Sequence, residues 1–502
     1  MNLPASVRTT HNGGTVYLTD IPLLNEDHFC QTMLDATDHG WRVSSYFGVP
    51  EGEEVTLYAL LGYKEDGIIA VLRTRVRGSF PSLSTLCPQL QLFEREIWEQ
   101  CGIIPEGHPW LKPVRFAPPV AKGGERPTPG VMEFYRVEGE EVHEVAVGPV
   151  HAGIIEPGHF RFQCHSEEVF HLEIALGYQH RGIEAGLVGG PHLQTLFQME
   201  AAAGDTTIGH TWAYGMIMEA LTGRRVPARG EALRGIALEL ERLANHTGDL
   251  GAIAGDVGYL PTASFCGRIR GDFLNMTALL CGSRFGRGLI RPGGAGFDCD
   301  DRQRDELLQR VVTARKELTV AVDLLWSSQS VMTRLEKTGT VTLKDAEELG
   351  LVGPAMRASG GSRDIRQDYP FGIYRMKQIP PVTTTTGDVY ARALIRWREA
   401  ERSLDFIEEL LQQLPGGKCR SDSLGSSPPA PDMLAVALVE GWRGRICHVA
   451  LTDSAGHFRK YKITDPSFHN WFGLALALRG EQISDFPLCN KSFNLSYCGF
   501  DL

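Results

Sequence analysis

The chain has 502 residues, and its 61 acidic side chains outnumber the 50 Lys and Arg residues, which gives a formal net charge of −11. This length predicts about three domains, and the negative charge argues against nucleic acid as a partner, because nucleic-acid-binding proteins neutralise phosphates. The 11 cysteines include no CxxC pair, which argues against a disulfide framework and against an iron–sulfur ferredoxin module within the chain.

The N-terminal part has the pattern of a small mixed domain. No apolar signal sequence opens the chain and no run of 18 apolar residues occurs, so we expect a cytoplasmic protein. Residues 14–117 contain short runs rich in β-branched residues, TVYLTDI, VTLYALLGY and GIIAVLRTRV, with helix-like segments between and after them. Residues 118–144 begin with the Pro- and Gly-rich stretch PPVAKGGERPTPG, which predicts a linker.

The remainder, residues 145–502, has a mainly helical pattern. Residues 231–246, 305–326 and 388–414 each place apolar side chains at helical spacing, and such long amphipathic helices favour a bundle. A β-type segment from Gly444 to Ile463 and an apolar helix near Asn470–Leu478 follow. The predicted fold class is α+β: a small α+β domain followed by a large, mainly helical bundle domain with β-segments.

The stretch GPVHAGIIEPGHFRF combines two histidines with one carboxylate. His151, Glu156 and His159 have side chains that titrate near neutral pH when their surroundings shift them, so they are candidates for a proton relay. A surface turn that leads into a strand is the alternative interpretation. Both remain open at this point.

Two further stretches carry polar groups without a specific pattern. Zinc on Cys164, His165 and His171 would need a fourth ligand that no suitably spaced residue supplies, and the alternation there favours a strand. In EAAAGDTTIGHTWAY, Asp205 and His210 accompany small residues that open a helix, which suits close packing against a helix or a ligand. Nucleotide-binding glycine loops and a GxSxG elbow are absent from the sequence, so nothing supports a kinase or hydrolase.

Several motifs occur together in a specific order. FEREIWEQCGI and GHPWLKPVRF resemble the end of the C-type subunit of respiratory complex I, and GPVHAGIIEPGHFRF, LGYQHRGIEAGL, ELERLANHTGDLG and IRPGG resemble its D-type subunit. Their fused order, with GDVYARALIRWREAERS and DFPLCNKSFNLSY, resembles the large subunit of energy-converting membrane-bound nickel–iron hydrogenases of the formate-hydrogenlyase or hydrogenase-4 type. The resemblance implies a domain like the C-type subunit at 14–117 and a domain like the D-type subunit at 145–502.

The resemblance also implies a metal site whose ligands this chain lacks. Hydrogenases of this family hold nickel and iron with four cysteines, and alignment on His210 and on the C-terminal motif puts these positions at Ala203, Thr206, Ser496 and Gly499. Cys498 lies one residue out of register, and one thiolate cannot replace four. We therefore expect no metal bound by this chain.

In the D-type subunit of complex I the emptied cleft receives a quinone head group, held by a histidine of the GPxH turn and by a tyrosine. Here the turn carries His151 and His159, whereas Gly204 stands at the tyrosine position. A replacement donor would have to come from another polar side chain nearby: Asp205, His210 or Tyr214.

The resemblance gives two more residues a role. Glu156 matches the glutamate that passes protons from the active site, and Arg443 matches the arginine that overhangs the metal in hydrogenases. A buried arginine without a counter-charge is costly, so we expect Arg443 to have a carboxylate partner, Asp205 or Asp485.

Together these inferences predict a metal-free large subunit of a complex-I-like membrane-bound oxidoreductase. It would couple electron transfer from an iron–sulfur subunit, with a quinone-type cleft, to proton or ion translocation. Expected partners are the iron–sulfur small subunit, antiporter-like membrane subunits and other hydrophilic-arm subunits, which attach the chain to the inner face of the plasma membrane; NAD(H) would act only through other subunits. A non-catalytic conformational transmitter is the alternative, and a working hydrogenase is the least favoured.

Overall fold

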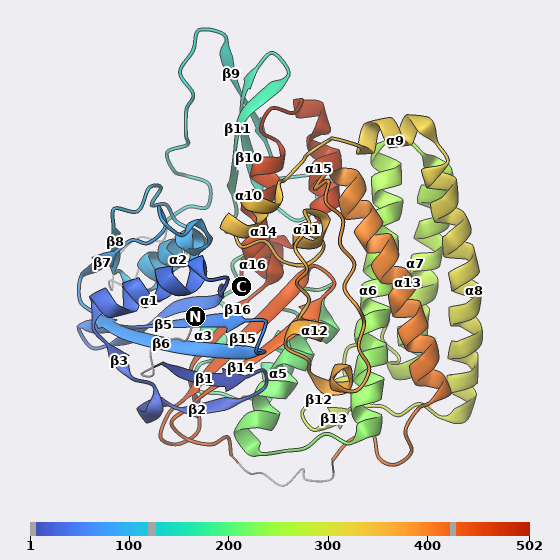
Figure 1. The fold of residues 1–502 in the computed structure, drawn as a ribbon, viewed down its shortest axis with the longest axis horizontal. Coiled ribbons are helices and arrows are strands. Elements are labelled where there is room, and N and C mark those ends of the chain that lie inside the picture. Colours follow the sequence, from blue (N-terminus) through green and yellow to red (C-terminus); the bar gives the residue numbers. More distant parts are fainter. Residues whose placement is uncertain (1–6, 119–126, 422–427) are drawn as a thin grey trace.

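The computed structural model describes residues 7–118, 127–421 and 428–502. A five-stranded sheet forms the N-terminal part, with the order β1-β6-β5-β4 and with β3 parallel to β6. Two helices, α1 and α2, pack on this sheet at the left of Figure 1. The elements are β1 (Arg8–His11), β3 (Leu23–Leu24), α1 (Glu26–Asp38), β4 (Arg42–Glu51), β5 (Glu54–Tyr63), β6 (Ile68–Val76) and α2 (Gln91–Cys101). A smaller parallel pair joins β7 (Ser79–Pro81) to β8 (Ile104–Glu106).

A second sheet occupies the middle of the molecule, in the order β16-β15-β14-β2. Its strands are β2 (Thr15–Tyr17), β14 (Met433–Gly441), β15 (Gly444–Thr452) and β16 (Phe458–Thr464). Every residue of β14 and β15 is buried, as expected for strands covered on both faces. The β-type segment that was predicted to begin at Gly444 begins one strand earlier, with β14. The run TVYLTDI supplies β2, which pairs with β14 in this sheet and not with the N-terminal sheet.

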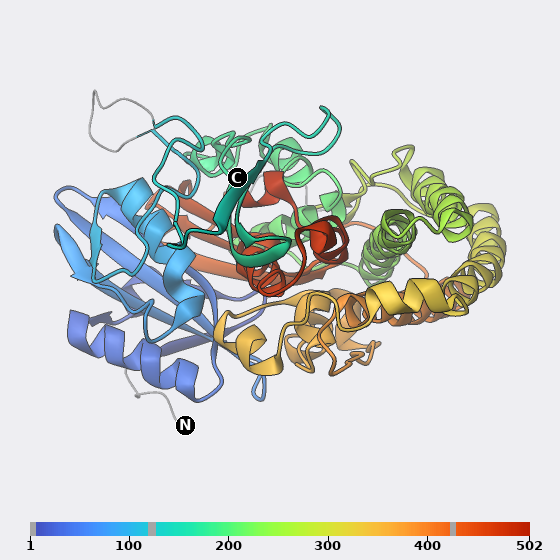
Figure 2. The same ribbon diagram turned by 90° about the horizontal axis from the view of Figure 1, so that it is seen from above.

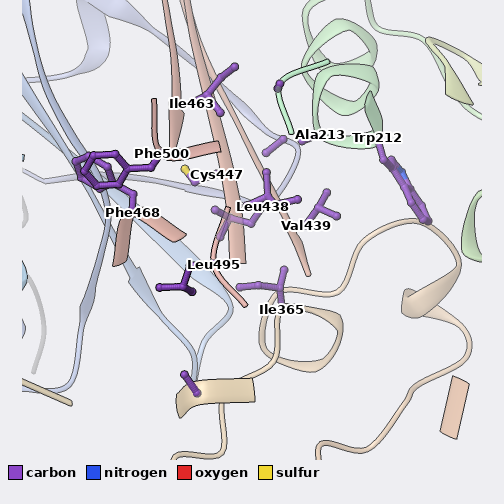
Figure 3. Close-up of a cluster of buried hydrophobic side chains, with 14 of the residues drawn as sticks. Trp212, Ala213, Ile365, Leu438, Val439, Cys447, Ile463, Phe468, Leu495 and Phe500 are labelled. Atoms are coloured by element: carbon purple, nitrogen blue, oxygen red, sulfur yellow. The ribbon is translucent and has the colours of Figure 1, made fainter. Parts of the chain in front are cut away.

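Apolar side chains on the two faces of this sheet hold the layers together. Figure 3 shows Leu438, Val439 and Cys447 between Trp212 on one side and Phe468 on the other. All five are at most 2% exposed. They belong to one core cluster that runs from the N-terminal sheet to the C-terminal helices.

Long helices form a bundle at the right of Figure 1 and are seen nearly end-on in Figure 2. They are α6 (Ala228–Asp256), α7 (Leu260–Cys281), α8 (Asp301–Trp326) and α13 (Val389–Gln412). The three helices predicted from spacing are confirmed. Helix α6 runs ten residues beyond its predicted end. Within this extension Gly251 lets α7 pack closely, since a Cβ there would lie 2.7 Å from Cys266 Cβ. The largely buried helix α5 (Thr207–Thr222) lies between bundle and sheet.

A three-stranded antiparallel sheet, β11-β10-β9, lies at the top of Figure 1. It comprises β9 (Val142–Val147), β10 (His159–His165) and β11 (Glu168–Ala175), so the strand expected around His171 is present. Within the described ranges, no helix has both the length and the apolar character required to cross a membrane.

Short elements complete the chain. They are α3 (Ile183–Leu187), α4 (Thr195–Glu200), β12 (Ile290–Arg291), β13 (Gly294–Ala295), α9 (Gln329–Leu335), α10 (Leu343–Glu348), α11 (Gly353–Ala358), α12 (Ile365–Asp368), α14 (Pro466–Ala477), α15 (Phe486–Phe493) and α16 (Tyr497–Phe500). The apolar helix predicted near Asn470 is α14.

Candidate functional site

The four positions aligned with metal ligands come from two segments that meet in space. Ala203 and Thr206 immediately precede α5, while Ser496 caps α16 and Gly499 lies within it. Arg181 joins the segments, because its guanidinium donates to the carbonyls of Ala202 at 2.8 Å and of Cys498 at 3.0 Å. The fold thus gathers positions almost 300 residues apart in the sequence around one point.

An ion pair lies at this point. Both terminal nitrogens of Arg443 donate to the Asp205 carboxylate at 2.7 Å, and Nη1 also lies 3.4 Å from Thr206 Oγ1. The Arg443 side chain is 4% exposed and stacks 3.8 Å from the centre of the Trp442 ring. Asp205 is therefore the carboxylate partner that the sequence led us to expect. Asp485, the other candidate, instead accepts from Arg334.

The pair holds both groups in their charged forms. Burial by itself disfavours ionisation of Asp205, but the adjacent Arg443 guanidinium outweighs it and keeps the pKa of Asp205 below its usual value. Burial likewise opposes the charge of Arg443, and Asp205 more than compensates, so the pKa of Arg443 is raised.

A buried chain of hydrogen bonds extends from this centre, and sequence reasoning identified only one of its members, His210. His210 Nε2 lies 3.1 Å from Asp465 Oδ2, and His210 Nδ1 lies 3.0 Å from His448 Nε2. Tyr461 OH lies 2.9 Å from His448 Nδ1. One tautomer satisfies every bond: the tyrosine donates to His448, which donates to His210, which donates to Asp465.

The electrostatics of this hydrogen-bonded chain favour a neutral imidazole at His448, in its middle. Burial, followed by the proximity of His210, holds the pKa of His448 well below its usual value. Burial raises the pKa of Tyr461 well above the ordinary tyrosine value. Burial opposes the charge of Asp465, but its hydrogen bond with His210 lowers its pKa overall. The chain therefore ends on an ionised carboxylate.

Glu156 reaches the same region from the turn between β9 and β10. Its carboxylate accepts from the backbone N–H of Tyr497 at 3.3 Å. Burial and the neighbouring Glu156 raise the pKa of the Cys498 thiol to about 11, so Cys498 is protonated near neutral pH. The glutamate expected to carry protons thus lies against the C-terminal segment.

The two histidines of the turn face the backbone of their own loop. His151 Nε2 lies 2.9 Å from Gly158 O, and His159 Nδ1 lies 3.2 Å from Gly148 O. Burial lowers the pKa of His159, and Arg161 donates to its other ring nitrogen. No hydrogen bond joins either imidazole to Asp205, His210 or Arg443, all of which lie in the described ranges. The structure therefore pairs Asp205 with Arg443, joins His210 to Asp465 and places Glu156 against the C-terminal segment, while the two histidines contact their own loop.

A small pocket opens beside Asp205. Its wall includes Gly204, Glu241, Asn245 and Arg270, and a Cβ added at Gly204 would meet no atom within 4 Å. Glu241 accepts from the backbone N–H groups of Ile208 at 2.7 Å and Gly209 at 3.2 Å. Burial raises the pKa of Glu241 to about 8 despite these bonds. Space thus lies where the resemblance expected a tyrosine.

The residues present do not fit a nickel–iron centre. None of the four aligned positions carries a thiol. At Gly499 a Cβ would lie 2.7 Å from Asp465 Cγ, so even a cysteine there would need the carboxylate to move. Within the described part of the chain, no three His, Cys, Asp or Glu side chains cluster as metal ligands would.

Sequence reasoning missed Asp465, His448, Tyr461 and Glu241. Asp465 had one recognisable signal, an Asp-Pro-Ser helix start, and its side chain does accept from Ser467 N at 2.8 Å. His448 is 238 residues from His210 and lies on a strand, where a histidine is ordinarily only a packed side chain. Nothing in local spacing marks it.

Comparison with known proteins places both parts of the chain. The profile of the respiratory-chain NADH dehydrogenase 30 kDa subunit matches residues 23–121, and that of the 49 kDa subunit matches residues 256–434. Carbon monoxide-induced hydrogenase of Rhodospirillum rubrum is 29% identical over 356 residues, 70% of this chain and 97% of that protein. Formate hydrogenlyase subunit 5 of Escherichia coli is 28% identical over 482 residues, covering 91% and 84%. NADH-quinone oxidoreductase subunit 4 of Thermus thermophilus is 28% identical over 369 residues, covering 69% and 90%.

Proposed function

We propose that this chain, which belongs to the family of complex-I-like and hydrogenase-type large subunits, works without a nickel–iron centre. The chain fuses a 30 kDa-type domain to a 49 kDa-type domain. In this proposal it is a large subunit of a membrane-bound oxidoreductase that couples electron transfer from an adjacent iron–sulfur subunit to proton or ion translocation. Two relatives are named as subunits of formate hydrogenlyase and of NADH-quinone oxidoreductase, which supports a multi-subunit setting.

One observation carries the proposal. The four positions that would hold metal converge, yet the charged groups beside them are Arg443, paired with Asp205, and the Asp465 carboxylate, which is hydrogen-bonded to His210. The Asp205 carboxylate supplies the counter-charge that a buried arginine needs, so the centre is electrostatically satisfied by protein groups alone.

Elemental analysis tests the metal-free centre. We expect the purified complex that contains this chain to hold far less than one nickel atom per copy of the chain. A nickel–iron hydrogenase complex purified in the same way is the control and should contain stoichiometric nickel. Stoichiometric nickel bound to this chain would contradict the proposal.

For the reaction, we propose that a quinone-type ligand binds beside the Asp205–Arg443 pair, with His151 and His159 as hydrogen-bond partners and Asp205 and His210 lining the cleft. Glu156 and Arg443 adjust the proton path. The pocket that Gly204 and Asp205 line supports a position beside Asp205, and the contact of Glu156 with the C-terminal segment supports a proton path on that side. The quinone would supply the redox chemistry, and the chain would orient it and move protons.

A double variant tests the histidines. Replacing both His151 and His159 with Ala should lower quinone-linked electron transfer by roughly tenfold to a hundredfold, the range for lost proton-transfer or hydrogen-bonding groups, while the complex still assembles. His165→Ala, a half-exposed histidine at the end of the same sheet, is the matched control. Unchanged turnover in the double variant would contradict the quinone role and favour the non-catalytic transmitter.

The proposed setting follows from the same relatives. We propose that an iron–sulfur small subunit, antiporter-like membrane subunits and other hydrophilic-arm subunits attach the chain peripherally to the inner face of the plasma membrane. One of the relatives is named as part of a membrane-bound hydrogenase. Electrons from NAD(H), where it is the donor, would arrive only through other subunits.

A further inference from the structure

An apolar groove lies where helix α2, strand β11 and helix α14 meet, between the N-terminal part of the chain and its C-terminal helices (Figure 1). The groove consists of two hollows. The first encloses about 660 Å³ of atom-free space and the second about 610 Å³, and both volumes include space that is open to solvent. His171, Leu172, Phe472 and Ala475 line both hollows, so the hollows join at these side chains. None of the residues given a role in the candidate site lines either hollow.

Aromatic and aliphatic side chains make up most of the wall. Four aromatic rings line the first hollow: Trp110, Trp471, Phe472 and Phe500. Aliphatic side chains from α2 and β11 complete this part of the wall. Trp110 and Phe472 are 36% and 37% exposed. An apolar molecule seated in the groove would remove these ring surfaces from water, which is favourable.

The ionic side chains of the first hollow are bonded within the protein. Glu173 accepts hydrogen bonds from Trp110 Nε1 at 3.2 Å, from Lys112 Nζ at 2.6 Å and from the backbone N–H of Tyr135 at 2.7 Å. Arg95 donates to two backbone carbonyls at 2.8 Å. Burial lowers the pKa of Arg95 to about 10, and the nearby carboxylate of Glu173 opposes this shift. These groups therefore need no ionic ligand to balance them.

The charged groups of the second hollow lie at its rim. Glu348 and Arg479 are exposed, and Asp345 accepts a hydrogen bond from the hydroxyl of Thr342. Ion pairs formed with charges that stay in water contribute little to binding. The rim therefore gives no strong preference for an ionic ligand.

A polar group without a partner lies at the junction of the two hollows. Among the described residues, neither ring nitrogen of His171 has a hydrogen-bond partner. Its ring lies against the ring of Tyr135, with 4.7 Å between the ring centres. Burial lowers the pKa of His171, so the imidazole is neutral near pH 7 and has one N–H donor and one acceptor nitrogen. A hydroxyl or carbonyl group can form a hydrogen bond with such a ring.

We propose that this groove binds a neutral, elongated, lipid-like molecule, with its apolar chain along the two hollows and a single hydroxyl or carbonyl group held by His171. Ligand sites of this kind have mostly apolar walls and a few placed polar groups that fix the orientation of the ligand. A charged head group would lose its water in the groove without gaining a partner of opposite charge, which is costly.

Tryptophan fluorescence of the full chain tests the proposal, because Trp110 and Trp471 lie in the wall and bromine quenches tryptophan on contact. The probe is ω-bromoundecanol, kept below its solubility limit. We expect saturable quenching with one molecule bound per chain. The anionic analogue ω-bromoundecanoate should bind about tenfold more weakly, because its carboxylate would have to lose water.

Two variants locate the bound molecule. Ala475→Phe, at a half-buried position in the wall of both hollows, should fill their junction and abolish the saturable quenching. His171→Leu should weaken binding of the alcohol about three- to tenfold, since one hydrogen bond is lost. The controls are Ala185→Phe, at an exposed position on α3, and His165→Leu, at a half-exposed histidine of the same sheet. Both controls should leave binding unchanged.

Three outcomes with the isolated chain would overturn the proposal: no saturable quenching, equal binding of the alcohol and the carboxylate, or equal binding by His171→Leu and the unchanged chain. If Ala475→Phe does not fold, His171→Leu still decides the question. Binding that is present in the isolated chain and lost in the assembled complex would also overturn it, because a partner subunit would then cover the groove. The variants change no residue of the candidate site, so failure here does not bear on the metal-free centre.

Discussion

The contact between Asp205 and Arg443 depends on the shape of the arginine side chain. A planar guanidinium donates through both terminal nitrogens to one carboxylate, which a lysine ammonium does not reproduce. Its third nitrogen donates to the carbonyl of Asn494, so the same side chain also holds the C-terminal segment in place. Three hydrogen bonds to two residues thereby fix the position of the Arg443 charge.

Removing Arg443 tests how strongly the pair is coupled. Arg443→Met should lower the free energy of unfolding by about 2–3 kcal/mol, below the usual cost of breaking a buried pair because the Asp205 side chain is 35% exposed. Combined with Asp205→Asn, the loss should be smaller than the sum of the two single losses. Urea unfolding measures all three variants. Arg268→Met, which breaks exposed pairs with Asp272 and Glu317, should cost less than about 1 kcal/mol. Strict additivity at the Asp205–Arg443 pair would contradict the coupling.

At the scale of elements, helix α6 supplies the cap of helix α5. The first backbone N–H groups of a helix have no partner within it, and Glu241 of α6 accepts from two of them, at Ile208 and Gly209. The same contact fixes the start of α5, where Thr206 and Asp205 stand. The position of the centre therefore depends on how α5 and α6 pack.

The pH dependence of stability reports on Glu241. Because its pKa is raised to about 8 in the folded chain, the folded state keeps a proton that the unfolded state releases above about pH 4.5. This contribution to stability is complete below that pH and is lost as the pH rises through 8. The side chain in Glu241→Gln stays neutral at every pH. As the pH rises from 5 to 8, the free energy of unfolding of the unchanged chain should therefore fall more steeply than that of Glu241→Gln, by up to about 1.4 kcal/mol per pH unit.

Denaturant unfolding at several pH values measures this difference. Glu317→Gln, an exposed position on α8, serves as the control and should follow the unchanged chain. Parallel stability curves for Glu241→Gln and the unchanged chain would show that Glu241 is ionised in the folded state.

At the scale of the whole molecule, the N-terminal strand β2 is part of the sheet that the C-terminal strands form. Strand β2 pairs with β14, and the buried Asn12 amide accepts from Leu438 N at 2.7 Å and donates to Leu438 O at 2.9 Å and Tyr369 O at 2.8 Å. One side chain thus joins segments up to 426 residues apart. Because these bonds link the first strands to the last sheet, we expect the two parts to unfold together.

Asn12→Ala tests this linkage. It leaves one buried N–H and two carbonyls without their partner, so the free energy of unfolding should fall by about 2–4 kcal/mol. Calorimetry should show a single transition at a lower midpoint, with Thr9→Ala, at an exposed position of the neighbouring strand β1, as a near-neutral control. Two separate transitions in the unchanged chain would contradict a shared core.

Local pattern was informative where burial follows a regular period. The helices at 231–246, 305–326 and 388–414 were predictable because one apolar face repeats every three to four residues. In the run TVYLTDI only Thr15–Tyr17 form a strand, since Leu18–Asp20 form a 3₁₀ turn, and the sheet that this strand joins was not predicted. An alternating apolar pattern shows that a strand has one buried face, but it does not show which strand lies beside it.

The sequence by itself, through its resemblance to the hydrogenase family, assigned the four expected metal-ligand positions to Ala203, Thr206, Ser496 and Gly499, and it narrowed the partner of Arg443 to two carboxylates. Only the tertiary structure decided between those two, placed the two turn histidines on their own loop, and joined His210 to Asp465, His448 and Tyr461. The physical reason is that apolar periodicity and helix capping report only on local burial and on the hydrogen bonds that the nearby backbone requires. Contacts between residues hundreds of positions apart exist only once the sheets and helices pack and place the side chains.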